Sequence, residues 1–146
     1  MSDIKTIKDA IKTQLDALVT AGKLAGCEQT DMRVDPLGGE IPLTPYAYIM
    51  PPSTESESVD NRTLLRKYRF DIMVVVKGEN VNTNTYLEEL IENLLNQFDN
   101  VPTLNGAADG AVEPVTSTPE PLTHKNGSLV VFFITLIAHK TKTLTF

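Results

Sequence analysis

Ser128 to Lys140 reads SLVVFFITLIAHK, and this stretch decides the fold of the chain. Alternate side chains of a strand point to opposite faces, and in this stretch both faces are apolar. It contains too many β-branched and aromatic residues for a comfortable helix, and it is too short to cross a bilayer as one. A strand that is apolar on both faces must be covered twice. We expect the helices of the chain to cover one face, and a second layer of sheet or another protein chain to cover the other.

A second long strand is predicted from Arg66 to Val76. Met73 and Val75 make its outer face apolar toward the end of the strand. Because this strand shares the two-sided pattern of Ser128 to Lys140, we expect the two strands to be neighbours at the centre of the sheet. Its alternation places five side chains on the inner face: Tyr68, Phe70, Ile72, Val74 and Val76.

Two amphipathic helices and two short strands complete the predicted regular structure. Apolar residues at three- and four-residue spacing predict helices from Ile4 to Ala21 and from Asn82 to Phe98. Alternating residues predict a short strand within Glu28 to Pro36. Tyr46 to Met50 is a second short strand, and the prolines on both sides of it are typical of a sheet edge.

Two polar segments are predicted as long loops. Residues 51–64 read PPSTESESVDNRTL, which predicts a long mobile loop between two antiparallel strands. Residues 103–127 form the second loop, with a short edge strand expected within Ala111 to Thr116. The whole chain, residues 1–146, is therefore expected to be a single α+β domain. Its mostly antiparallel sheet would have about four or five strands, with two helices packed on one face.

Charge and composition argue against several classes of function. The net charge of −6 is unfavourable for a protein that grips nucleic acid phosphates. Cys27 is the one cysteine, so no intrachain disulfide can form, which fits a reducing cytoplasm. No stretch has the pattern of a signal peptide or a transmembrane helix. We therefore expect a soluble protein without a membrane partner.

Catalytic and metal-binding residue types are few and scattered. Cys27, His124 and His139 are the usual nucleophile and base types, but no local motif surrounds them. Three acidic residues lack the ordered spacing of a metal site: Asp31, Asp35 and Glu40. We therefore expect no enzyme, no cofactor and no metal. A small enzyme or ligand-binding module is the alternative, and a reactive Cys27 thiol with a depressed pKa would favour it.

The surplus apolar surface of the two long strands predicts packing against copies of the same chain. The expected subunit interface comprises Met73, Val75, Val130, Phe132, Ile134 and Leu136. The acidic segment between the strands is expected to project toward a lumen or a partner, through Glu55, Glu57, Asp60 and Arg62.

The layout of the chain resembles the tail terminator proteins of long-tailed bacteriophages, also called tail completion or minor tail proteins. The shared order starts with an amphipathic helix, here Ile4 to Ala21. A strand pair follows, Tyr46 to Met50 and Arg66 to Val76, around the polar STESESVDNR. A helix of the kind LEELIENLLNQF and the apolar strand SLVVFFITLIAHK complete the order. The resemblance covers nearly the whole chain and is one of layout and length.

This resemblance implies a structural virion protein. Such proteins form a homohexameric ring at the head-proximal end of the tail, where the ring stops polymerisation of the tube and joins tail to head. The implied partners are other copies of the chain, the tail tube protein and a head–tail connector protein, and DNA passes through the lumen without specific binding. The implied location is the virion, after synthesis in the host cytoplasm. Another head–tail connector or neck protein is the alternative within the same region of the virion.

Overall fold

A computed structural model describes residues 2–30, 43–78, 84–124 and 127–144. The fold class is α+β, as the sequence predicts, with two helices and seven strands in the described residues. The elements in chain order are α1 (Asp3–Thr20), β1 (Gly26–Gln29), β2 (Tyr46–Ile49), β3 (Ser53–Ser58), β4 (Thr63–Lys77), α2 (Asn84–Asp99), β5 (Val115–Thr116), β6 (Glu120–His124) and β7 (Gly127–Thr143).

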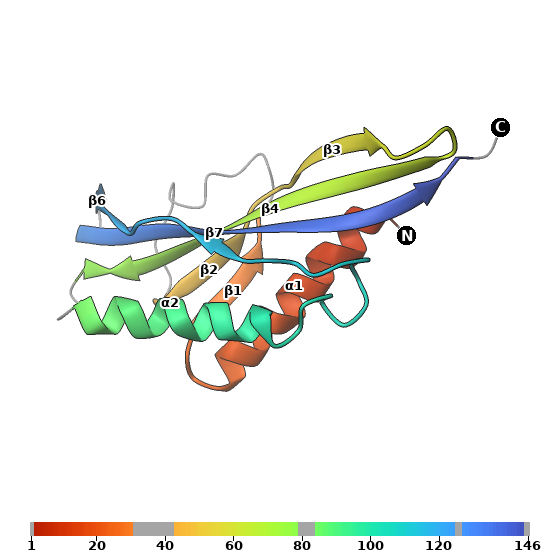
Figure 1. Cartoon of the computed structure of the whole chain (residues 1–146). Helices are drawn as coiled ribbons and strands as arrows, with labels where there is room; N and C mark the ends of the chain where they lie inside the picture. The colour runs from red at the N-terminus through yellow and green to blue at the C-terminus, as the bar shows by residue number, and fades with distance from the viewer. Residues whose placement is uncertain (1, 31–42, 79–83, 125–126, 145–146) are drawn as a thin grey trace.

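The strands form one mixed sheet (Figure 1). Its main path is β1-β2-β4-β7-β5, while β3 adds to β4 and β6 adds to β7. β1 and β2 are parallel, and the other strand pairs are antiparallel. β4 and β7 pair along the whole of β4, from Thr63 opposite Thr143 to Lys77 opposite Leu129. The prediction that the two long apolar strands are neighbours at the sheet centre is confirmed.

Both helices lie on the same side of the sheet (Figure 1). The α1 stripe buries Ile7, Ile11 and Leu15, which are four residues apart and therefore share one face of the helix. Ser2 caps α1, because its side-chain oxygen accepts a hydrogen bond from the backbone N–H of Lys5. One continuous core joins these side chains to α2 and to the facing side of β2, β4 and β7. Its bulkiest fully buried members are Phe70, Phe98 and Phe132.

The predicted long loop over residues 51–64 is wrong. Ser53–Ser58 forms β3, which pairs with β4 in a hairpin, and every β3 side chain is exposed. The Asp60 carboxylate shapes the turn, accepting hydrogen bonds of 2.8 Å from the backbone N–H groups of Arg62 and Thr63. A strand at a sheet edge needs no apolar face of its own when a neighbour supplies its backbone partners. The polar composition of residues 51–64 therefore gave no indication of a strand.

The predicted loop over residues 103–127 is only partly a loop. The short strand expected within Ala111 to Thr116 is confirmed as β5, but β6 was not predicted, since Pro121 within it is a weak strand former. These additions raise the strand number above the expected four or five. β1 overlaps the start of the strand predicted within Glu28 to Pro36, whose residues from 31 onward lie outside the described residues.

Candidate functional site

The register of β4 and β7 defines two faces of the sheet. Residues opposite each other across an antiparallel pair point to the same side. Phe132 lies opposite Val74, and both belong to the core beneath the helices. Phe133 lies opposite Met73 and points the other way. We call this second side the open face, because neither described helix contributes to its cluster of buried residues.

A small apolar cluster occupies one end of the open face. Tyr48, Met73, Val75 and Leu129 are buried there, with Tyr46 and Val131 packed against them. The rings of Tyr46 and Tyr48 are tilted by 49°, with their centroids 5.0 Å apart. Burial raises the pKa of Tyr48 to about 12. This end of the open face is therefore a small second core within the chain.

Four large apolar side chains remain exposed on the open face. Phe133 is 38% exposed and Ile137 is 40% exposed. Val115 of β5 lies opposite Thr135, and Leu122 of β6 lies opposite Leu129, so both point to this same side. They are 64% and 39% exposed. We call these four residues the open-face patch: Val115, Leu122, Phe133 and Ile137.

A hollow of about 550 Å³ lies beside the open-face patch. Glu120 is the charged residue among its lining residues, and the apolar ones are Met73, Pro121, Leu122, Val131 and Phe133. The backbone of this region is held in place because Ser117 N–H donates to the Phe133 carbonyl and Phe133 N–H donates to Ser117 Oγ, each at 2.9 Å. The face is therefore concave and preformed, and it can accept an apolar side chain.

The structure corrects most of the predicted interface. Phe132, Ile134 and Leu136 are fully buried beneath the helices, so the prediction that they meet another subunit was wrong. Val130 lies opposite Val76, so it points to the same helix-covered face as these three residues. The remaining two predicted residues, Met73 and Val75, do lie on the open face, where they are buried in the small cluster.

The exposed residues of the open face had a signal in the sequence. Phe133 and Ile137 form the other alternate set of the same apolar strand, so only the choice between the two sets was wrong. Alternation shows that a strand has two apolar faces, but it does not show which face the helices will cover. Val115 and Leu122 had no such signal, because short strands flanked by prolines lack a clear period.

The predicted acidic segment lies at the far end of the β3–β4 hairpin. Glu55 and Glu57 are side chains of β3, and Asp60 and Arg62 lie in the turn. Lys67 Nζ is 3.4 Å from Glu57 Oε2. Hydrogen bonds from the backbone N–H groups of Arg62 and Thr63 lower the pKa of Asp60. These groups are thus carried on a paired strand and an ordered turn.

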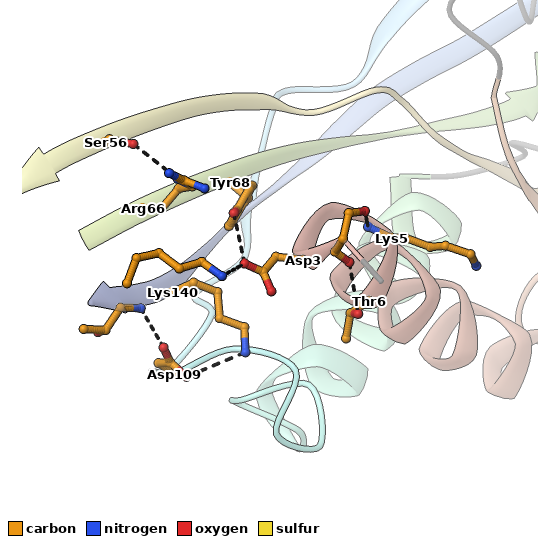
Figure 2. A network of polar contacts seen from close by, with 11 residues as sticks. Asp3, Lys5, Thr6, Ser56, Arg66, Tyr68, Asp109 and Lys140 are labelled. Carbon is orange, nitrogen blue, oxygen red and sulfur yellow. Dashed lines mark hydrogen bonds and ion pairs between the residues drawn. The ribbon is translucent and has the colours of Figure 1, made fainter. Parts of the chain in front are cut away.

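A polar network ties the start of α1 to the ends of β4 and β7 (Figure 2). Asp3 forms an ion pair with Lys142, and Tyr68 Oη donates to Asp3 Oδ2 at 3.4 Å. The hydrogen bond from Lys142 lowers the pKa of Asp3. Beside it, Arg66 Nε donates to Ser56 Oγ at 3.3 Å. Because most of these charged groups form ion pairs or hydrogen bonds with one another, the network holds the start of α1 against the sheet.

The candidate catalytic residues are not brought together as a nucleophile and base. Cys27 is half-buried on β1, whereas His139 lies on β7, with β2 and β4 between them. Burial, and next the Asp16 carboxylate that accepts from the thiol at 3.2 Å, raise the pKa of Cys27 to about 11. This shift is opposite to that of an activated thiol. His124 lies at the end of β6.

Metal-site and membrane signatures are also absent from the described part of the chain. Within residues 2–30, 43–78, 84–124 and 127–144, no group of three or more histidine, cysteine or acidic side chains could hold a metal ion. Asp31, Asp35 and Glu40 lie outside the described residues. Neither described helix is long and apolar enough to cross a membrane. Comparison with known proteins found no family model and no curated protein that matches the chain.

Proposed function

We propose that copies of this chain assemble through the open face into a ring of the tail terminator type. The ring closes the head-proximal end of a phage tail tube, stops its polymerisation and joins the tail to the head. The observation that supports this proposal is the open-face patch: Val115, Leu122, Phe133 and Ile137 are exposed on one face, and Leu122 and Phe133 line a hollow there. Contiguous apolar surface of this kind marks interaction sites in monomeric folds.

Two further observations fit an assembly of copies. The patch residues belong to β5, β6 and β7, which are paired strands, so the surface is held rigid before any subunit binds. Rigid interfaces lose less conformational entropy on association. The choice of a ring over a dimer rests on the resemblance in layout, since a ring uses contacts between two different patches of each subunit.

The acidic hairpin gives the ring a surface past which DNA can slide. Glu55, Glu57 and Asp60 are exposed on β3 and the turn after it. If this hairpin borders the lumen, its carboxylates repel DNA phosphates and keep the DNA from binding. The proposed protein partners are the tail tube protein below the ring and the head–tail connector protein above it.

The test is the mass of the protein in solution, with negative-stain images of the concentrated sample. We expect wild-type particles of several chain masses with a central hole, and we expect Phe133→Asp combined with Ile137→Asp to be monomeric. Val59→Asp is the matched control, because Val59 is 62% exposed but lies in the turn after β3. The control should assemble like the wild type.

Tail tubes provide the second arm of the experiment. A ring that forms only on a tube end should still limit tube growth when the chain is added during polymerisation. A wild-type chain that stays monomeric at every concentration and leaves tube length unchanged would contradict the proposal. Equal loss of assembly in the Val59→Asp control would show that the open-face patch is not the contact surface.

A further inference from the structure

The outer edge of β3 is a second surface suited to a partner. β3 pairs with β4 from Ser53 opposite Arg69 to Ser58 opposite Leu64, and all six of its side chains are exposed. Among the described strands, β4 is its only partner. An edge strand presents alternate N–H and C=O groups outward, which can pair with another extended chain.

The opposite edge of the sheet is closed by the chain itself. β5 and β6 pair with β7 along its first half. Beyond them, Asp109 N–H donates to the His139 carbonyl at 2.9 Å, and Thr141 N–H donates to Asp109 Oδ2 at 2.7 Å. A single loop residue thus occupies backbone groups of β7 that another strand would need. The edge of β3 has no such cover from the described residues.

The two acidic side chains of β3 point to the same face of the sheet. Glu55 and Glu57 lie opposite Lys67 and Leu65, so both acidic side chains point to the open face. Glu57 has the nearby Lys67 ammonium, whereas Glu55 makes no ion pair within the described residues. A hollow of about 370 Å³ adjoins Glu55 and Ile137, with Lys67 and Arg69 of β4 on its other side from the β3 edge. An added strand would therefore place alternate side chains beside two carboxylates.

We propose that the β3 edge binds an extended segment of a partner protein that carries lysine or arginine at alternate positions. Main-chain hydrogen bonds to β3 hold the segment, and its basic side chains lie beside Glu55 and Glu57. Lys67 lies opposite Glu55 in the register and forms an ion pair with Glu57, so a basic neighbour of these glutamates is accommodated on this face. This partner surface goes beyond the proposed ring contact, because the β3 backbone and its two glutamates supply the binding, and the open-face patch residue Ile137 only borders the adjoining hollow.

A second copy of the same strand is a poor occupant of this edge. Antiparallel pairing of two β3 strands along their length brings a glutamate opposite a glutamate, whichever register keeps the faces matched. Like charges directly opposite each other destabilise a strand pair. Nucleic acid is disfavoured for the same reason, since its phosphates would meet the two carboxylates. The edge is thus selective for a basic peptide segment.

The experiment uses ¹⁵N-labelled protein and a capped Lys-Thr-Lys-Thr-Lys-Thr peptide. We expect the amide signals of residues 53–58 to shift on titration, and their hydrogen exchange to slow. Glu55→Lys combined with Glu57→Lys should weaken binding by about tenfold or more, because two favourable charge pairs become repulsive. The matched control is Glu88→Lys with Glu89→Lys, which makes the same charge change on exposed positions of α2. It should change the affinity by less than about twofold.

A tethered form of the probe keeps a weak interaction measurable. The same peptide, joined after Phe146 by a short Gly-Ser linker, acts at an effective concentration of about millimolar. If residues 53–58 keep their signals and exchange rates even then, the proposal is overturned. Equal weakening by the control pair would reveal general charge attraction and would also overturn it. Phe133→Asp alone, which changes a patch residue outside the hollow beside Glu55, should bind the peptide normally, so failure of the ring leaves this inference standing.

Discussion

Phe132 and Phe133 are neighbours in β7, yet they belong to two different environments. Phe132 is fully buried beneath the helices, whereas Phe133 is 38% exposed on the open face. The covered face obtains its partners from α1 and α2 of the same chain. The open face has a small cluster of its own at one end and keeps apolar surface exposed beyond it. Two faces of one strand therefore differ: the first stabilises the domain, and the second is the one through which we propose that copies assemble.

The largest expected effect separates these two phenylalanines directly. Phe132→Ala should lower the free energy of unfolding by about 3–5 kcal/mol, because it leaves a cavity in the core. Phe133→Ala should lower it by less than about 1 kcal/mol in the monomer, because the side chain keeps much of its contact with water. Urea unfolding at a concentration where the chain is monomeric measures both values. Similar losses for the two variants would contradict the division of the faces.

The second effect concerns the chemistry of the covered face. Cys27 lies opposite Ala47, a core residue, and burial is the main reason that its pKa rises from 9.0 to about 11. At pH 7.5 the thiolate fraction should be about a hundredfold lower than in an unperturbed thiol, and alkylation by iodoacetamide should slow accordingly. The rate should rise as the pH approaches 11. A rate equal to that of free cysteine would contradict the raised pKa, and a faster rate would favour the alternative of an enzyme with an activated thiol.

The smallest effect tests the link between α1 and the long strands. Asp3 has a pKa below its ordinary value of 3.8, chiefly because of Lys142. Its contribution is therefore present above about pH 4 and is lost as the pH falls through the lowered pKa. Asp3→Asn should cost about 0.5–1 kcal/mol at pH 7, and the difference from the wild type should be smaller at pH 3. Unfolding curves at both pH values measure this, and a difference that stays constant would contradict the role of the ion pair.

Prediction from the sequence succeeded where side-chain periodicity was strong. The helices and the two long strands were predicted to within a few residues of α1, α2, β4 and β7 because each repeats its apolar positions over several turns or pleats. It failed for β3 and β6, whose side chains are mostly polar or interrupted by proline. Their strand conformation depends on backbone hydrogen bonds to β4 and β7, which are distant in sequence.

The sequence by itself determined that this chain is an α+β domain with more apolar strand surface than two helices cover. That property is local, since it follows from the order of residues along each strand. Only the tertiary structure decided which alternate set faces the helices, because this depends on how α1 and α2 pack against the finished sheet. Phe132 is in the core and Phe133 on the open face for that reason. The edge of β3 likewise forms only when β3 pairs with β4, which also pairs with β2 and β7.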